Sequence, residues 1–588
     1  MNMKPELGLT ILVDALRFQI DPGAFVSVLS QLCVLDQLTQ RDDEFRDIAR
    51  SNAGAKQVLV GELLEAGVAS LARQEISNPA ELINVDSPGW SLLPSVWINQ
   101  VLESLQDSEI SPERRGRWLL TQARGRLGRK LDFPREFLAL IRQLSRKAES
   151  VYLPLDAPAL SILEVTSRTQ EVTLRPQSEQ AYKLVKRALF VARRKGTVQD
   201  RNPYSRRGIP GASLAVIIPP PGERVDRTLL QEESLVHWAD KNPRLPEEFA
   251  VAANAAEAGQ NVLAFVPSGL LFRGGRSKAL REWLVETMGL QYVIELPPRC
   301  LPNTPIGYAL LSIRPKRSSK PDSIRLVAAD SSKFITKSSK SNRLSNGHEL
   351  ARVTLSPKHG EHDEVAVVEK AAIRENDYVL NPARYQTQDL DRLLENSRVV
   401  RLGNLCRIIF PVPTKDSREE PTMAYFEVLM SDFESDGTVA HGSKKRLLDY
   451  PWVSKARKDE LRPGDILLGV KGTIGKVAIV TEEADENLLA GQSMVILRLE
   501  DRDRIPDPVY LLRYLSQPAV DKYLNAMAGG SAIRFVRSKD IAKLPVPIGS
   551  LEEQAKVCEL HVQIVDAIAE AHDCMEEARR LNVSAFRE

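Results

Sequence analysis

The segment SLAVIIPPPGER, residues 213–224, is the stretch from which the fold of the middle of the chain is predicted. Its apolar residues 214–218 indicate a short buried strand. Three consecutive prolines end that strand, because proline fixes φ and lacks a backbone N–H donor. Such a corner is either a plain strand terminator or the edge at which an α/β sheet presents a site. Both interpretations stay open on this segment alone.

Strands and helices alternate on both sides of this corner, from residue 131 to 345. Apolar segments of strand length are separated by segments of helix length, which is typical of a mostly parallel, doubly wound sheet. The predicted strands are SVYLPLDAP (150–158), EVTLRPQ (171–177), NVLAFVPSG (261–269), QYVIELPP (291–298) and GYALLSIRP (307–315).

Composition limits the class of protein. The chain has 588 residues, enough for three or four domains, and a formal net charge of +2, so any basic surface must be local. Its five cysteines lack metal-ligand or redox spacing, so we expect reduced thiols, no metal site and a cytoplasmic location. The start lacks the pattern of a signal peptide, and no apolar run is long enough to span a bilayer.

The pattern changes along the chain and predicts five regions. Residues 1–130 are predicted to be helical, 131–345 to be α/β, 346–397 to connect, 398–550 to form short strands with glycine turns, and 551–588 to form one long helix. Ser550 and Glu553 predict a capping box at the start of that helix. Within the first region, a basic run is either a solvated helix face or a phosphate-facing patch. It comprises Arg114, Arg115, Arg117, Arg124, Arg126, Arg129 and Lys130.

Two sets of motifs resemble a known family. The proline corner, the run 261–298 and a segment of the connecting region resemble the adenine-specific DNA methyltransferases of type I restriction-modification systems. That segment contributes Ile373, Asn376, Asp377, Tyr378, Leu380, Asn381, Arg384 and Tyr385. Residues 398–550 resemble a target recognition domain of type I specificity subunits. Its motifs are GDIL (464–467), GTIGK (472–476), GGSAI (529–533) and LPVP (544–547), followed by LEEQ (551–554).

The resemblance implies three sites, and each is degenerate here. The family binds S-adenosylmethionine with Asp-Pro-Ala-Cys-Gly-x-Gly, whereas this chain has Leu153, Pro154, Leu155 and Asp156 without a glycine. Pro176 replaces the glutamate that holds the ribose, unless Glu171 or Glu179 substitutes through a register shift.

The third degenerate site is the base clasp. The family has Asn-Pro-Pro-Phe or Asn-Pro-Pro-Tyr there, and this chain has Ile218, Pro219, Pro220 and Pro221. We therefore expect no catalytic residue and no cofactor, that is, a pseudo-methyltransferase. The alternative is an active adenine-specific enzyme that uses S-adenosylmethionine.

The expected architecture is multidomain α/β, with an N-terminal helical domain, a methyltransferase-like parallel sheet and an α+β target recognition domain that ends in a long helix. The expected function is sequence-specific binding of double-stranded DNA, as the target-recognition component of a bacterial restriction-like or phage-defence complex. A pure assembly protein is a third possibility.

Cationic side chains are the candidate DNA contacts, and each is alternatively a solvated surface charge. In the methyltransferase-like region they are Arg193, Arg194, Lys195, Arg201, Arg206 and Arg207. In the recognition region they are Lys471, Lys476, Arg534, Arg537 and Lys539.

A partner is expected on the long helix, because its apolar residues recur at steps of three and four. They are Val557, Leu560, Ile564, Ala567, Ala571, Cys574, Ala578 and Leu581. The partner is a second copy of the chain or another subunit of a complex. A helix packed on its own domain is the alternative.

Overall fold

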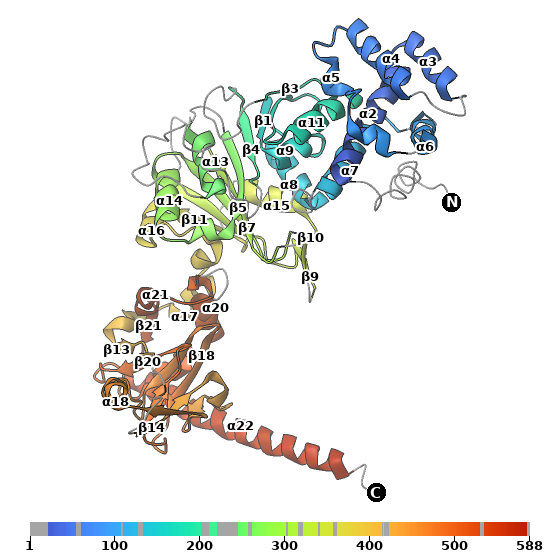
Figure 1. Cartoon of the computed structure of the whole chain (residues 1–588). Coiled ribbons are helices and arrows are strands. Elements are labelled where there is room, and N and C mark those ends of the chain that lie inside the picture. The colour runs from blue at the N-terminus through green and yellow to red at the C-terminus, as the bar shows by residue number, and fades with distance from the viewer. Residues whose placement is uncertain are drawn as a thin grey trace. The chain divides into compact units, whose positions relative to one another are not determined.

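A computed structural model describes the chain from residue 21 to 584, and the chain divides into two compact units, residues 1–382 and 383–588 (Figure 1). The description leaves out 54–59, 94, 107–109, 128–132, 201–210, 220–244, 257–260, 302–303, 315–321, 339–340, 357–361, 414–415, 417–422 and 530–533. Within the described part of the chain, no helix combines the length and the apolar character needed to cross a membrane.

The first unit begins with a helical region built around α2 (Pro22–Thr39), which is buried along most of its length. The other helices of this region are α3 (Asp43–Ala53), α4 (Val60–Arg73), α5 (Pro79–Leu82), α6 (Ser95–Gln106) and α7 (Pro112–Leu127). A buried ion pair joins α2 to α7, because the Arg115 guanidinium binds the Asp36 carboxylate and neither side chain is more than 2% exposed. The same guanidinium donates to the Leu105 carbonyl at 2.8 Å.

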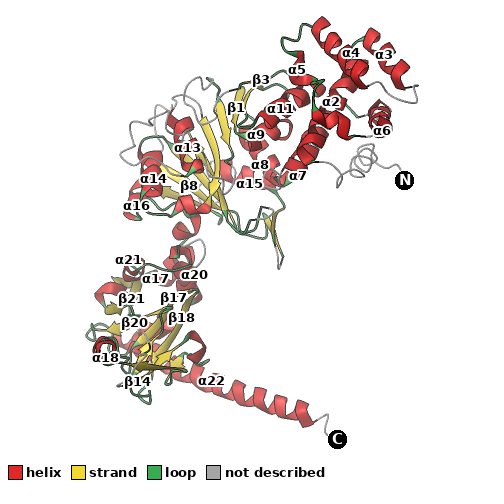
Figure 2. Cartoon of the chain, viewed as in Figure 1, coloured by secondary structure: helices red, strands yellow, loops and turns green. Residues whose placement is uncertain are grey.

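A nine-stranded sheet forms the centre of the first unit, with the order β11-β8-β6-β7-β5-β4-β1-β2-β3 (Figure 2). Most neighbours are parallel, as the sequence predicts, but β7 runs antiparallel to both β5 and β6, and β11 runs antiparallel to β8. The bounds are β1 (Ser150–Pro154), β2 (Glu171–Arg175), β3 (Thr197–Val198), β4 (Leu214–Ile217), β5 (Asn261–Pro267), β6 (Leu290–Leu296), β7 (Tyr308–Ile313), β8 (Ser323–Ala328) and β11 (Val365–Glu369).

Helices cover this sheet, and an aromatic ring of α8 packs against the aromatic rings of its strands. Phe137 of α8 lies 4.3 Å from Phe265 of β5, which in turn stacks on Tyr308 of β7 at 4.7 Å between ring centroids. The helices are α8 (Arg135–Ser145), α9 (Asp156–Leu160), α10 (Ile162–Val165), α11 (Glu179–Val191), α13 (Pro246–Ala256), α14 (Arg276–Glu286), α15 (Gly347–Leu355) and α16 (Lys370–Glu375). A small hairpin, β9 (Ile335–Lys337) and β10 (Asn342–Leu344), lies outside the main sheet.

The segment that precedes the division between the units is held by long-range polar contacts. The Tyr378 hydroxyl lies 3.0 Å from the Glu286 carboxylate of α14, and the Asn381 amide donates to Glu295 of β6 at 3.0 Å. Arg384, which follows the division, binds the Met527 carbonyl at 2.9 Å and Asp540 at 3.2 Å, both within the second unit. The residues before and after Pro382 are therefore each anchored in their own unit.

The second unit is an α+β domain with two main sheets. One has the order β13-β20-β17-β18-β15 and the other β16-β14-β19, while β12 pairs with β21. Its strands are β12 (Arg398–Arg401), β13 (Cys406–Ile409), β14 (Met423–Val428), β15 (Thr438–Val439), β16 (Lys444–Leu448), β17 (Ile466–Lys471), β18 (Thr473–Val480), β19 (Leu488–Ala490), β20 (Met494–Leu499) and β21 (Pro545–Ile548). Its helices before the last are α17 (Gln388–Leu394), α18 (Tyr450–Ala456), α19 (Pro508–Leu515), α20 (Pro518–Met527) and α21 (Ser538–Ala542).

The last helix, α22 (Leu551–Ser584), begins with the predicted capping box. The Ser550 N–H donates to the Glu553 carboxylate at 2.6 Å, and the Glu553 N–H donates to the Ser550 hydroxyl at 3.2 Å. Only the first turns pack on the domain, where Val557 and Cys558 contact its apolar core. Farther along, apolar side chains are exposed, and Leu581 is 63% exposed.

Candidate functional site

The carboxyl edge of β1 and β2 is where the resemblance places a cofactor. Leu153 is fully buried within β1, and the chain leaves the strand through Leu155 at φ 74°. A leucine rarely adopts this left-handed backbone, which is strained for a side chain with a Cβ. The Leu155 N–H donates to the Arg175 carbonyl at 2.9 Å, so the ends of the two strands are joined directly.

Asp156 closes the same edge with its side chain. Its carboxylate accepts from the N–H groups of Gln177 at 2.6 Å and Ser178 at 3.0 Å, and from the Ser178 hydroxyl at 2.7 Å. That hydroxyl also accepts from the Ala181 N–H at 3.2 Å and so caps α11. The one carboxylate of this loop therefore fastens β1 to the start of α11.

The end of β2 carries a buried cation. Arg175 is fully buried, donates to the Gln199 side chain at 2.8 Å, and lies 5.6 Å from the centre of the Tyr152 ring. Burial raises the pKa of Tyr152 to about 12, although the positive charge of Arg175 acts in the opposite direction. Pro176 follows and has no side-chain acceptor. A ribose bound at this position would therefore lack the glutamate carboxylate that the resemblance implies for its hydroxyls.

The two glutamates named as substitutes lie at different places. Glu171 is the first residue of β2 and so lies at the opposite end of that strand from the carboxyl edge. Glu179 is the first residue of α11, directly after this edge, and forms an ion pair with Lys183 at 2.6 Å. Substitution by either glutamate through a register shift stays a prediction.

The proline corner is described only in part. Ile218 is fully buried and Pro219 is buried beside it, while Pro220 and Pro221 lie outside the described residues. Among the residues described at this edge, none forms the glycine loop, the ribose carboxylate or the amide acceptor that the resemblance implies. The residues present here do not fit S-adenosylmethionine in the family's manner.

The residues of the predicted cationic cluster after α11 differ in exposure and in hydrogen-bond partners. Arg193 is exposed and donates to Gln40 at 3.2 Å, Arg194 turns inward and donates to the Ser167 carbonyl, and Lys195 is exposed. Burial lowers the pKa of Arg194. Arg201, Arg206 and Arg207 lie outside the described residues.

Two of the predicted recognition residues are neighbours in the second unit. Lys471 ends β17, and the N–H of the following Gly472 donates to the Arg534 carbonyl at 3.0 Å. A β-bridge pairs Lys471 with Phe535, whose ring is 45% exposed. Both residues are exposed, and the Arg534 guanidinium also donates to the Asn525 carbonyl. The tip of the β17–β18 hairpin and the strand-like segment 534–536 are here called the hairpin surface.

The other predicted recognition residues are placed differently. Lys476 is exposed, but its ammonium donates to the Met430 carbonyl at 2.6 Å and lies 5.2 Å from the Phe433 ring centre. Arg537 forms an ion pair with Asp540 at 2.8 Å. Lys539 is exposed on α21. Lys471 and Arg534 are thus the pair that the fold brings together.

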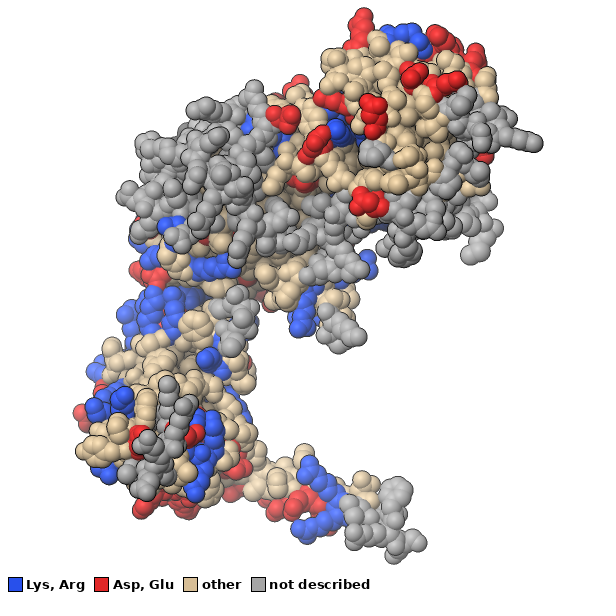
Figure 3. Space-filling model, viewed as in Figure 1, with Lys and Arg blue, Asp and Glu red and all other residues tan. Residues whose placement is uncertain are grey.

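Exposed residues that the sequence analysis did not select lie on a second part of the same unit. Lys444 and Lys445 are exposed on β16, an edge strand, and Tyr450 at the start of α18 is 77% exposed. The run Lys-Lys-Arg ahead of Tyr-Pro-Trp was the available signal. Arg446 is paired, at 2.6 Å with Glu427 and 2.9 Å with Asp416. Figure 3 shows lysine and arginine side chains at several places on the visible face of this unit.

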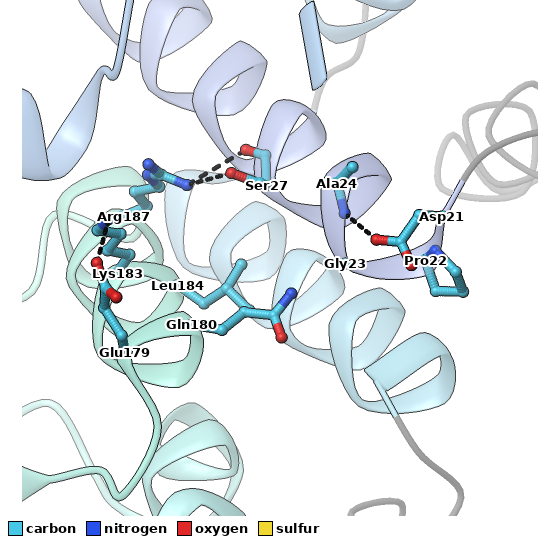
Figure 4. Close-up of a pocket in the computed structure, with 10 residues that line it drawn as sticks. All are labelled: Asp21, Pro22, Gly23, Ala24, Ser27, Glu179, Gln180, Lys183, Leu184 and Arg187. Carbon is cyan, nitrogen blue, oxygen red and sulfur yellow. Dashed lines mark hydrogen bonds and ion pairs between the residues drawn. The ribbon is translucent and has the colours of Figure 1, made fainter. Parts of the chain in front are cut away.

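A polar cavity of about 640 Å³ lies between the start of α2 and α11 (Figure 4). Its charged groups are already used: Lys183 pairs with Glu179, Arg187 donates to the Ser27 hydroxyl at 3.3 Å, and Asp21 caps α2 by accepting from the Ala24 N–H at 2.8 Å. The Arg187–Ser27 contact joins the helical region to the sheet domain, whereas the other two lie within α11 and at the start of α2.

Two family models match the chain. Residues 251–392 match N-6 DNA Methylase, and residues 449–572 match the type I restriction modification DNA specificity domain.

Two curated proteins are similar over short stretches. The type I restriction enzyme EcoBI specificity subunit of Escherichia coli is 28% identical over 101 residues, 17% of this chain and 20% of that protein. The type I restriction enzyme MpnII methylase subunit of Mycoplasma pneumoniae is 29% identical over 125 residues, 21% of this chain and 22% of that protein. Each match therefore spans only about a fifth of the relative's length.

Solved structures show the fold. The methyltransferase subunit of the type I restriction-modification system from Streptococcus thermophilus gives a TM-score of 0.51 at 15% identity, over 65% of this chain and 98% of that one. The type IIG restriction endonuclease BpuSI gives a TM-score of 0.51 at 12% identity, over 95% of this chain and 75% of that one.

Proposed function

This chain joins an N-6 DNA methylase domain to a type I restriction-modification DNA specificity domain, and on that premise we propose that it recognises a sequence in double-stranded DNA without methylating it. The second unit reads the DNA, and the methylase-like domain supports it as a scaffold. The chain serves as the target-recognition component of a restriction-like or phage-defence complex in the bacterial cytoplasm, a role taken from the resemblance and not from the chemistry of a site.

The proposal that the chain does not methylate DNA depends on the carboxyl edge of β1 and β2, where hydrogen bonds join the strand ends and the loop that follows. A methyl donor needs room against the backbone at this edge and a carboxylate for its ribose. Here Leu155 and Arg175 are joined through their backbones, and the Asp156 carboxylate accepts three hydrogen bonds from the start of α11. The family model for the methylase also begins to match only at Val251, after all three degenerate segments.

The hairpin surface supports the DNA-binding half of the proposal. Lys471 and Arg534 are exposed cations on adjacent backbone segments, which suits contact with backbone phosphates, and the exposed Phe535 pairs with Lys471 across the β-bridge. Gly475 lies within β18 at φ 85°, and a Cβ there would collide with the Asp521 carboxylate. This position of the strand therefore favours glycine.

The exposed part of α22 supports the proposal of a dimer with a second copy of the chain. Leu560, Ile564 and Leu581 are 53%, 40% and 63% exposed, and they recur at heptad steps in the sequence. Small residues between them allow close approach of a second helix. Two copies would bring two recognition units to a longer DNA site, as two-fold symmetric readers do.

Two measurements on the purified full-length chain test the absence of methyl transfer. Isothermal calorimetry with S-adenosylmethionine is expected to show no binding at micromolar concentrations. Incubation of duplex DNA with the protein and S-adenosylmethionine is expected to leave no N-6-methyladenine. Binding of the cofactor together with methylated product would establish the alternative, an active adenine methyltransferase.

Two further measurements test DNA binding and the dimer. The protein is expected to retard a random duplex at low salt, and a lack of retardation even there would favour a pure assembly protein instead. Light scattering after size exclusion is expected to give the mass of a dimer, and Ile564→Asp with Leu560→Asp is expected to give a monomer. A monomeric mass for the unaltered chain would refute the dimer.

A further inference from the structure

A cleft of about 950 Å³ in the first unit has a strongly basic lining that the proposed function does not use. It lies between α7 and α8, next to α10, which contacts both helices. Glu164 is the single carboxylate among the residues that line it. Its arginines are Arg114, Arg117, Arg124, Arg135, Arg142 and Arg146.

Arg124 lies at the inner wall with an unused donor. Its side chain is 3% exposed, and its two terminal nitrogens donate to the Leu160 carbonyl at 2.7 Å and to Glu164 at 2.8 Å. Among the described residues, its Nε has no hydrogen-bond partner, and neither has the buried Nε of Arg117. Buried guanidinium donors without acceptors are unfavourable, so these two groups leave positive polarity behind the inner wall that a nearby anion would offset.

Free cations line the outer wall. Arg142 of α8 and Arg146 at its C-cap are one helical turn apart and exposed, and Arg135 is exposed at the start of the same helix. None of the three side chains has a partner within the described part of the chain. Like charges one turn apart repel each other, and a bound anion would relieve that repulsion.

Arg194 extends the positive charge beside the cleft. It donates to the carbonyl of Ser167, a residue of the lining, while its Nε and Nη1 are buried without a partner among the described residues. Burial lowers its pKa, Glu113 opposes that effect, and the positive charges of Arg142 and Arg168 add to it. The local field therefore favours a ligand that carries several negative charges.

We propose that this cleft binds a nucleoside polyphosphate. Guanidinium groups match phosphate oxygens in geometry as well as charge, and the largely buried Trp118 and Phe133 present only their edges to the lining, as an apolar part against which a base can pack. The volume lies within the usual range of roughly 300–1,000 Å³ for small-molecule sites. Duplex backbones are contacted by cations on open surfaces, whereas Arg124 is enclosed, so a free nucleotide fits this cleft better than a duplex does.

The test compares affinities for ATP, inorganic tripolyphosphate and a random duplex, measured by calorimetry or fluorescence anisotropy on the full-length chain. Arg142→Ala with Arg146→Ala removes two outer cations without touching a buried contact. Arg50→Ala with Lys147→Ala is the matched control, since it removes two exposed cations of the same unit outside the cleft.

The cleft variant is expected to weaken ATP binding by roughly tenfold or more, as loss of charge-assisted hydrogen bonds does, while the control binds like the unaltered chain. ATP is expected to bind more tightly than tripolyphosphate, because the base also contributes. Equal affinities for the two would overturn the nucleoside part of the proposal. No ATP binding at millimolar concentration, or a cleft variant that weakens only duplex binding, would overturn it entirely.

Discussion

Replacing both Lys471 and Arg534 with alanine is expected to reduce the salt dependence of DNA binding. The two side chains are exposed on adjacent backbone segments, which the Gly472–Arg534 hydrogen bond of 3.0 Å holds together. Each backbone amide and carbonyl is kept in the double variant, which removes two charges and the hydrogen bond of Arg534 to the Asn525 carbonyl. The slope against salt concentration, and not the affinity alone, therefore reports the electrostatic contribution of this pair.

The magnitude follows from counterion release. Each phosphate neutralised on duplex DNA contributes about 0.9 to the slope of log K against log salt concentration. Loss of two contacts should lower the slope by about 1.8 for each protomer on the DNA, and so by about 3.6 for the proposed dimer. Between 50 and 200 mM salt, a fourfold change, the unaltered protein should then lose about 12-fold more affinity per bound protomer than the variant does.

Fluorescence anisotropy with a labelled duplex, repeated over a series of salt concentrations, measures these slopes. Arg398→Ala with Lys458→Ala is the matched control, because both are exposed cations of the same unit away from the hairpin. Equal slopes for the hairpin variant and the unaltered chain, or an equal decrease in the control, would refute the assignment of DNA contact to the hairpin surface.

Three further predictions concern stability. Asp36→Asn should lower the free energy of unfolding by about 3–5 kcal/mol in urea denaturation, because it removes the carboxylate that pairs with the buried charge of Arg115. A double variant that also carries Arg115→Met should recover much of this loss, and no recovery would contradict this reasoning. Burial raises the pKa of Asp42, but hydrogen bonds from a serine, a backbone N–H and an arginine outweigh it and lower the pKa to about 2. Its contribution is therefore complete above its unfolded pKa of about 3.9 and is lost as the pH falls from there towards 2, so Asp42→Asn should flatten this part of the stability profile measured by circular dichroism. Gly475→Ala should lower the melting temperature of the second unit, since the alanine would need a left-handed backbone and its Cβ would collide with Asp521. An unchanged melting temperature would show that β18 and Asp521 adjust without cost.

The sheet of the first unit was predictable from its apolar segments, but the antiparallel directions of β7 and β11 were not predicted. The link between β6 and β7, residues 297–307, is too short for a crossover helix, and parallel neighbours need a dozen or more residues between them. An antiparallel β7 follows from that length. The signal was present in the spacing and not in the composition of the strands.

The candidate site was predictable only where it depends on residue type. The lack of a glycine between Leu153 and Asp156, and the proline at 176, are visible in the sequence. The three hydrogen bonds that engage Asp156 come from residues 21 and 22 positions later, which only the fold places beside it.

The basic run of α7 shows the same limit. Arg115 belongs neither to a solvated face nor to a phosphate-facing patch, because it meets Asp36 of α2, while Arg124 meets Glu164 of α10 in the wall of the basic cleft. The side chain of Arg126, and Arg129 and Lys130 entirely, lie outside the described residues. Local charge patterns thus reveal that a segment is cationic, while the partners that neutralise it come from distant elements.

The anchoring of the segment around Pro382 bears on how such chains diversify. Tyr378 and Asn381 are fixed by side chains of the first unit, and Arg384 by the second, so a crossover between two genes at this point would separate no contacting pair among these three anchors. The second unit could be exchanged there by recombination while the first unit is inherited intact. Under the proposed function, a library of chimeras joined after residue 382 would combine new DNA sequence specificities with one unchanged first unit.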